Sequence, residues 1–174
     1  TPNNPILTHI HFTLNGTQRL AITGNNKNGK TTLFKALLND PSIFKNGHWS
    51  TPKSGISYLD QHYRDLPRDK TVFSYIKSLR PDWTDRETRK HLNDYLFRKN
   101  EEVETPIARL SGGELCRLSL AKIGAQTPRL LFLDEITNNI DFETREHVIK
   151  VLNNFPAALL VISHDPDFLE RIHI

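Results

Sequence analysis

Two uninterrupted apolar runs in the second half of the chain predict strands that are buried on both faces. Residues 129–133 end in Asp134-Glu135, and residues 157–162 end in Ser163-His164-Asp165. Runs of this kind are typical of the inner strands of a parallel sheet. Because ligands of such sheets bind beyond the carboxyl ends of the strands, the polar residues after each run are candidate site residues.

The amino-terminal part of the chain predicts a strand, a loop and a helix in that order. Residues 19–23 predict the strand, and residues 30–38 predict the helix because their apolar side chains recur at helical spacing. Residues 5–24 taken together alternate as two antiparallel strands joined by a hairpin turn at Asn15-Gly16.

The middle of the chain predicts short strands followed by amphipathic helices. The strands are expected at residues 48–50 and 55–59, between turn signals. Thr84-Asp85-Arg86-Glu87 is a capping box that opens a helix, and residues 115–125 predict another. We expect residues 1–174 to form one domain in which residues 62–125 are approximately a helical subdomain.

A loop between the first predicted strand and the first predicted helix matches the phosphate-binding pattern G-x-x-x-x-G-K-[ST]. Its residues are Gly24, Asn25, Asn26, Lys27, Asn28, Gly29, Lys30 and Thr31, and Thr32 follows directly. In such loops backbone N–H groups surround phosphate oxygens, the lysine reaches the β and γ phosphates, and the hydroxyl holds Mg²⁺. The helix amino terminus adds free N–H donors. The loop therefore predicts a nucleoside triphosphate, against the alternative of a plain glycine turn.

A second stretch, Leu110-Ser111-Gly112-Gly113-Glu114, also suits a phosphate. Two glycines before a helix expose successive N–H groups at the positive end of its dipole. One bound nucleotide cannot easily touch both loops of a single domain. We therefore expect this second loop to act on nucleotide held by a partner domain.

Composition narrows the class of protein. The chain has 174 residues, of which 37% are hydrophobic, enough for one substantial core. No apolar run approaches the roughly 20 residues of a membrane helix, so we expect neither membrane insertion nor secretion. The only cysteine, Cys116, is read as a small helix residue and fits a reducing cytoplasm. The chain has no methionine, so we expect a processed piece or an excised fragment.

A local excess of basic residues in the middle of the chain leaves two interpretations open. Residues 64–99 hold ten Lys and Arg against six Asp and Glu, an excess of four, while the whole chain carries only +3. The simpler interpretation is a solvated helical face. The other is contact with nucleic-acid phosphates, although no aromatic residues are interleaved as in a base-stacking platform.

Taken in order, these motifs resemble the nucleotide-binding domain of the ABC superfamily over nearly the whole chain. The resemblance implies an α/β P-loop NTPase core with a mostly parallel sheet, antiparallel N-terminal strands and a helical subdomain. It also implies ATP and Mg²⁺ as ligands, ATP hydrolysis, and a head-to-tail dimer with a second ABC domain. The implied roles are phosphate binding and Mg²⁺ binding by Lys30 and Thr31, a Q-loop glutamine at Gln61 that reaches nucleotide and metal, a metal-shell carboxylate at Asp134, a catalytic carboxylate at Glu135, a D-loop at Asp141, and a switch histidine at His164.

One segment selects a branch of the family. Asp134-Glu135-Ile136-Thr137-Asn138-Asn139-Ile140-Asp141 looks like the E-P-T-N-H-L-D segment of ABC-F proteins, cytoplasmic tandem-domain ATPases that act on ribosomes. The short spacing from Gln61 to Leu110 leaves no room for the arm of a first ABC-F domain. The resemblance therefore implies a second ABC-F domain with the ribosome and its RNA as a partner. The alternatives are the ATP-binding subunit of an ABC transporter, a non-enzymatic ATP switch and a general nucleic-acid-binding module.

The chain departs from the family pattern at three positions. Lys27 replaces a glycine, Ile136 a proline and Asn139 a histidine. The residue that stacks on adenine in the family would precede Thr1, and the chain ends soon after His164. We therefore expect a domain that is truncated at both ends and hydrolyses ATP weakly as an isolated fragment.

Overall fold

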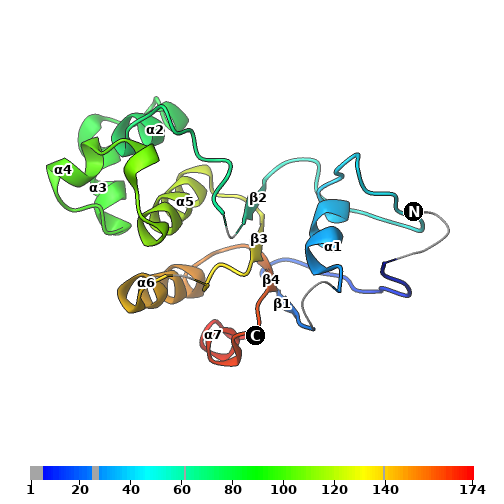
Figure 1. Ribbon diagram of the computed structural model, residues 1–174. Helices are drawn as coiled ribbons and strands as arrows, with labels where there is room; N and C mark the ends of the chain where they lie inside the picture. The colour runs from blue at the N-terminus through cyan, green and yellow to red at the C-terminus, as the bar shows by residue number, and fades with distance from the viewer. Residues whose placement is uncertain (1–5, 25–27, 61, 139) are drawn as a thin grey trace.

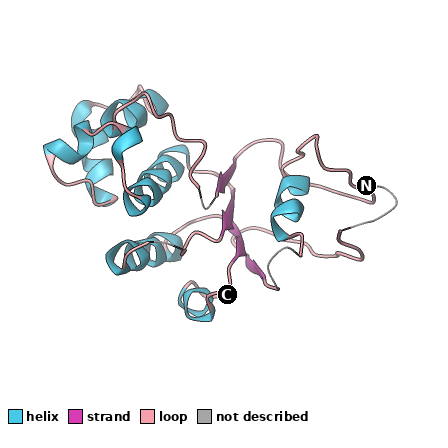
Figure 2. Cartoon of the chain, viewed as in Figure 1, coloured by secondary structure: helices cyan, strands magenta, loops and turns pink. Residues whose placement is uncertain are grey.

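A computed structural model describes residues 6–24, 28–60, 62–138 and 140–174. The elements in chain order are β1 (Arg19–Ile22), α1 (Lys30–Leu37), β2 (Ile56–Leu59), α2 (Val72–Leu79), α3 (Asp85–Asp94), α4 (Asn100–Glu104), the 3-10 helix η1 (Ile107–Arg109), α5 (Gly112–Gln126), β3 (Leu130–Asp134), α6 (Phe142–Asn153), β4 (Ala158–Ile162) and α7 (Pro166–Arg171). Helices separate successive strands along the chain, as in an α/β protein (Figure 2).

The four strands form one parallel sheet in the order β1-β4-β3-β2. The chain crosses the sheet in one direction from β1 to β2 and returns in the opposite direction through β3 to β4. Connections between parallel strands are right-handed, so the two directions of travel must use opposite faces. Accordingly, α1 covers one face, and α5, α6 and α7 lie on the other (Figure 1).

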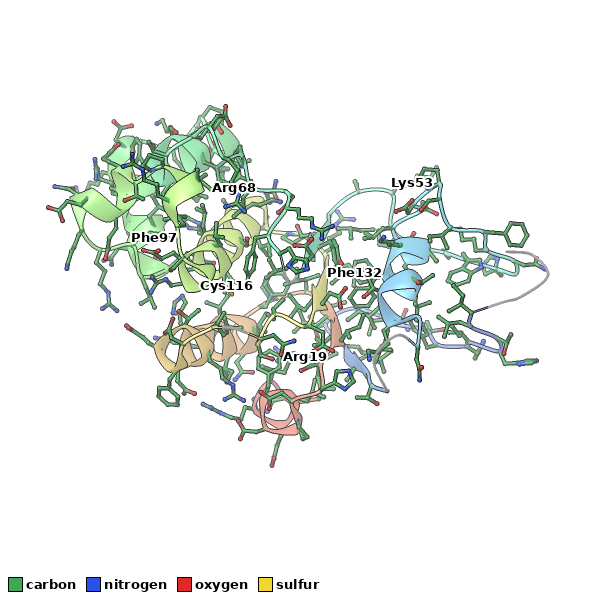
Figure 3. The ribbon with its side chains drawn as sticks, in the orientation of Figure 1. Arg19, Lys53, Arg68, Phe97, Cys116 and Phe132 are labelled. Atoms are coloured by element: carbon green, nitrogen blue, oxygen red, sulfur yellow. The ribbon has the colours of Figure 1, made fainter. Side chains whose placement is uncertain are left out.

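Alternation of side chains along the central strands divides the core between these two faces. Leu131 and Leu133 of β3 pack with the helices α5 and α6, whereas Phe132 packs against α1. Phe132 extends from β3 (Figure 3). Its ring lies 4.9 Å from that of Phe34, which is fully buried in α1. All residues of β3 and β4 are buried, which confirms the two strands that the apolar runs predict.

The helices α2, α3 and α4 gather beside α5, beyond the edge of the sheet formed by β2 (Figure 1). The predicted capping box opens α3: Thr84 accepts from the amide of Glu87, whose carboxylate accepts from the amide of Thr84. Cys116 is fully buried in α5, where burial raises the pKa of its thiol to about 11. It is therefore a core residue, as expected.

Two of the predicted strands are wrong. Of the predicted hairpin at residues 5–24, the described part of the first strand, residues 6–14, carries no strand, and neither do residues 48–50. β1 and β2 form close to the positions expected for the other two strands. The hairpin-type turn itself is present, since the amide of Gln18 donates to the carbonyl of Asn15 and Gly16 has a φ of 57°. Phe12, Leu14 and Trp49 pack as side chains against the α1 side of the core. Alternation signals that packing, but it does not supply the ladder of hydrogen bonds that defines a strand.

In the ranges covered by the structure, no helix is both long enough and apolar enough to cross a membrane.

Candidate nucleotide-binding site

The predicted site residues meet where two neighbouring strands send the chain to opposite faces of the sheet. β1 leads through the phosphate loop to α1, and β4 leads through His164 to α7 on the other face (Figure 1). The two strands pair in parallel with Ile22 opposite Ile162, so their carboxyl ends are adjacent. A sheet opens a crevice at such a switch point, which is where ligands of α/β proteins bind.

The phosphate loop presents the amino terminus of α1 to this crevice. Gly29 precedes the helix with a φ of 81°, and Gly24 has a φ of 133°. Glycine adopts such positive φ angles without the strain that a side chain would cause. Among the described residues no side chain caps α1, so its first N–H groups face the loop. Such a terminus suits an anion.

Lys30, the first residue of α1, contacts residues that follow both β1 and β4. Its ammonium group donates to the carbonyl of Gly24 at 2.5 Å and lies 2.8 Å from Nε2 of His164. The sequence separates these two side chains by 134 positions. The fold thus brings the lysine and the histidine of two predicted motifs into direct contact.

Asp134 is the last residue of β3 and is buried. It points to the α1 face because it lies two residues after Phe132. Its Oδ2 accepts hydrogen bonds from the hydroxyl of Thr31 at 2.9 Å and from the hydroxyl of Tyr58 at 3.0 Å. The structure therefore pairs the predicted metal carboxylate with the predicted metal hydroxyl, and it adds a tyrosine that sequence reasoning missed.

Glu135 turns the chain out of the sheet beside this carboxylate. Its φ of 53° is unusual for a residue with a side chain, and its amide still donates to the carbonyl of Ile162 in the neighbouring strand. Its Oε1 lies 3.2 Å from Nε2 of His164, but the two atoms form no hydrogen bond. Oε1 is buried and accepts no hydrogen bond within the ranges that the structure covers. A buried carboxylate oxygen without a donor can accept one from a water molecule.

The second predicted phosphate loop begins α5 rather than preceding it. Ser111 caps the helix by accepting from the amide of Glu114, whose carboxylate accepts from the amide of Ser111 at 2.8 Å. The helix therefore starts at Gly112, three residues before the expected start. The capping box leaves the amides of Gly112 and Gly113 outside it, at the amino end of the helix.

Asp141 lies against this second loop. It caps α6, and its carboxylate accepts from the amide and the hydroxyl of Thr144, both at 2.9 Å. The pKa of Asp141 lies below its usual value, chiefly because its carboxylate accepts a hydrogen bond from the backbone amide of Thr144. A Cβ at Gly113 would lie 2.7 Å from Oδ2 of Asp141 and 3.2 Å from the hydroxyl oxygen of Thr144. Gly113 is thus a glycine for steric reasons that the sequence pattern does not reveal.

Several predicted site residues lie outside the described ranges, and two others are placed only by their exposure. Asn25, Asn26, Lys27, Gln61 and the unusual Asn139 are outside those ranges. Asn28 is exposed in the loop, and Thr32 is half-buried in the first turn of α1.

The donor set fits magnesium. In the described part of the chain, no cluster of three or more His, Cys, Asp or Glu side chains could hold a metal ion. Magnesium at a phosphate site uses one or two carboxylates together with phosphate oxygens and water. Asp134 and the hydroxyl of Thr31, 2.9 Å apart, supply hard oxygen donors of that kind.

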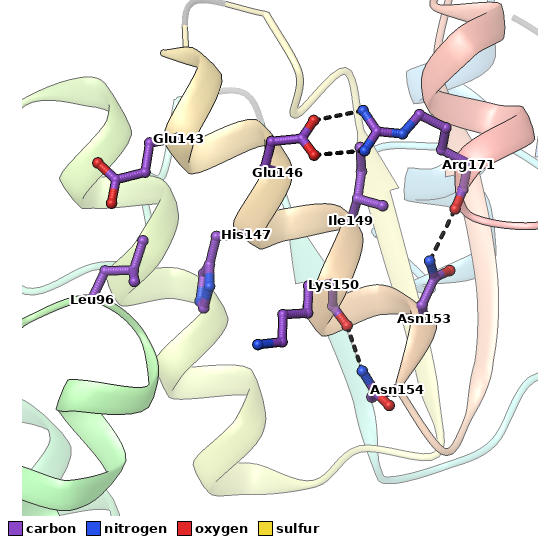
Figure 4. Close-up of a pocket in the computed structure, with 9 residues that line it drawn as sticks. All are labelled: Leu96, Glu143, Glu146, His147, Ile149, Lys150, Asn153, Asn154 and Arg171. Carbon is purple, nitrogen blue, oxygen red and sulfur yellow. Dashed lines mark hydrogen bonds and ion pairs between the residues drawn. The ribbon is translucent and has the colours of Figure 1, made fainter.

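Two hollows in the surface lie away from this crevice. One of about 580 Å³ runs along α6, where Glu146 forms two contacts of 2.5 and 2.6 Å with Arg171 of α7 (Figure 4). The other, of about 1100 Å³, is lined by residues that flank the amino ends of β3 and β4. Neither hollow contains the predicted phosphate-binding residues, which lie at the carboxyl ends of the strands.

Comparison with known proteins identifies the family. The family model described as ABC transporter matches residues 7–138. A putative ATP-binding protein YdiF of Bacillus subtilis is 34% identical over 168 residues, which cover 97% of this chain and 26% of that protein. The ATP-binding protein Uup of Haemophilus influenzae is 36% identical over 157 residues, 88% of this chain and 24% of that protein. Uup of Escherichia coli is 33% identical over 157 residues, 88% of this chain and 25% of that protein. The chain spans about a quarter of the length of these relatives.

Proposed function

Since this chain belongs to the ABC family of ATP-binding domains, we propose that it hydrolyses ATP with Mg²⁺ in a composite site that it shares with a second ABC domain. The observation that carries this proposal is the contact network at the carboxyl ends of β1, β3 and β4. There Lys30, His164 and Glu135 form one chain of contacts of 3.2 Å or less. Their neighbours in sequence, Thr31 and Asp134, are joined by a hydrogen bond of 2.9 Å.

The residues of this network divide the work of phosphoryl transfer. Lys30 and the amides of α1 bind phosphate oxygens, and His164 reaches the γ phosphate from the opposite side of the crevice. Thr31 and Asp134 hold Mg²⁺, together with Gln61. Magnesium supplies charge neutralisation on the phosphates when it is bound.

Glu135 is proposed to polarise the attacking water. Its Oε1, which accepts no hydrogen bond from the described residues, is placed to accept one from that water. A carboxylate strengthens the nucleophile by accepting its proton.

We propose a second domain because the two phosphate loops of this chain lie on opposite sides of its sheet. The loop at Gly24 to Thr31 opens α1, while Ser111-Gly112-Gly113 opens α5, and these helices cover opposite faces of the sheet (Figure 1). The second loop would close on nucleotide held by the other domain, with Asp141 beside it at the interface. The isolated chain is accordingly expected to be a monomer with poor ATPase activity.

We further propose that the full-length protein is a cytoplasmic ABC-F protein that binds ribosomes in its ATP-bound state. The support is the T-N-N-I-D segment at residues 137–141 and similarity to proteins such as Uup. The basic stretch at residues 64–99 would add phosphate contacts, although Lys77, Arg80 and Arg89 within it already pair with carboxylates. That contribution should weaken as salt is raised.

The test is co-sedimentation of the full-length Glu135→Gln protein with ribosomes through sucrose, with and without ATP. We expect ATP-dependent pelleting, because ATP favours the closed pair of domains and only a state-selective ligand shifts such an equilibrium. The family description names transporters, which makes a transporter ATPase the second candidate. Absence from the ribosome pellet together with co-purification on membranes would favour that candidate over the ribosome.

A further inference from the structure

Tyr58 of β2 shares one acceptor atom with the proposed metal-binding threonine. Its hydroxyl donates to Oδ2 of Asp134 at 3.0 Å, and Thr31 donates to the same oxygen at 2.9 Å. Tyr58 of β2 pairs with Phe132 of β3, and Asp134 lies two residues after Phe132. This diagonal relation places the two side chains on one face within reach of an aromatic ring.

The surroundings of Tyr58 fix the position of its ring. The ring stands edge-on to that of Phe34, with 6.1 Å between centroids and an interplanar angle of 83°. Phe34 lies one helical turn after Thr31 in α1. A phenol carries its proton at neutral pH, so the Tyr58 hydroxyl serves as the donor to the carboxylate.

We infer that Tyr58 is a positioning residue that holds the Asp134 carboxylate in place for Mg²⁺. The inference rests on the proposed function and adds a residue to it. A Thr31 hydroxyl that binds a metal through a lone pair can still donate its proton to Asp134, but only in a rotation that suits both partners. Tyr58 has no such second role, so its hydrogen bond keeps the carboxylate oriented. Partners that orient a metal ligand in this way strongly affect metal affinity.

The test is the Mg²⁺ dependence of ATP binding in the full-length Tyr58→Phe protein, followed with a fluorescent ATP analogue. We expect the Mg²⁺ concentration for half-maximal binding to rise about tenfold, whereas affinity in EDTA stays unchanged because the ring is kept. Lys30→Ala protein provides the baseline for any other nucleotide site. Tyr75→Phe, at a buried tyrosine of α2, is the matched control and should not change either value.

A double variant sharpens the test. In an Asp134→Asn background, Tyr58→Phe should cause much less than the tenfold shift, since its charged acceptor is gone. An unchanged Mg²⁺ dependence in Tyr58→Phe, or an equal loss of affinity with and without Mg²⁺, would overturn the positioning role while leaving the proposed function intact. A wild-type protein that does not bind ATP would overturn both.

Discussion

The ammonium group of Lys30 lies 2.8 Å from Nε2 of His164. An ammonium group has no lone pair, so Nε2 accepts in this contact and the ring proton is on Nδ1. The same Nε2 faces Oε1 of Glu135 at 3.2 Å without a hydrogen bond. The side chains of Lys30, His164 and Glu135 thus converge on one point near the carboxyl ends of β1 and β4. A γ phosphate at that point would offer acceptors to the lysine and draw it away from the histidine.

Lys30→Ala should weaken ATP binding by about tenfold to a hundredfold, because the change removes a charge-assisted contact to the phosphates. The measurement is titration of a fluorescent ATP analogue at fixed salt. Lys35→Ala is the matched control, since Lys35 is exposed on the same helix. Unchanged affinity in a folded Lys30→Ala protein would remove the phosphate loop from the proposal.

Glu135→Gln should lower the turnover of the full-length protein by about a hundredfold or more, since an amide cannot take a proton from water. ATP binding should persist, because the amide keeps the shape of the side chain. Steady-state phosphate release and nucleotide titration measure the two quantities. Glu143→Gln, at an exposed glutamate in the first turn of α6, serves as the control. Normal hydrolysis by Glu135→Gln would place the base elsewhere.

Gly113→Ala should lower the free energy of unfolding by about 1–3 kcal/mol. The added methyl group would lie 2.7 Å from Oδ2 of Asp141. The carboxylate must therefore shift and weaken its hydrogen bonds with Thr144, or α5 must move. Thermal or urea unfolding measures the change. Asp141→Ala removes the colliding carboxylate, and the double variant should therefore lose less stability than the two single variants together. Simple additivity would show that the two loops are not in steric contact.

Acidification from pH 7.5 to 5.5 should destabilise the protein through His91. This ring donates to the carbonyl of Ala121 at 2.8 Å and packs between Trp83 and Tyr95. Burial lowers the pKa of His91 below its usual value near 6.5. The unfolded chain then binds the proton more readily, so the stabilising contribution is complete above about pH 6.5 and is lost as the pH falls toward the folded-state pKa.

Melting temperatures at the two pH values test this expectation in wild-type and His91→Gln proteins. Carboxylates with lowered pKa values titrate below this window, so they do not obscure the result. The wild-type protein should lose more stability than the variant between pH 7.5 and 5.5. Equal losses would show that His91 is not the responsible group.

Much of the site was predictable because its motifs are local. The phosphate pattern, the apolar run before Asp134 and the run before His164 depend on residues adjacent in the chain. The comparisons confirm the family that these motifs indicate. Local patterns were less reliable for strand pairing. Alternation within residues 5–24 predicted a hairpin, but residues 6–14 carry no strand, and Phe12 and Leu14 pack on the core instead.

The sequence by itself determined the elements and the loops that carry chemistry, because helical spacing, capping boxes and buried runs are set by neighbouring residues. Only the tertiary structure decided which of these loops meet. Strand order placed the phosphate loop beside His164, the pleat aimed Asp134 at α1, and packing of α6 on α5 set Asp141 against Gly113. Tyr58 became a partner of Asp134 through pairing of β2 with β3. Contacts between residues distant in sequence depend on the packing of whole elements, which no local pattern records.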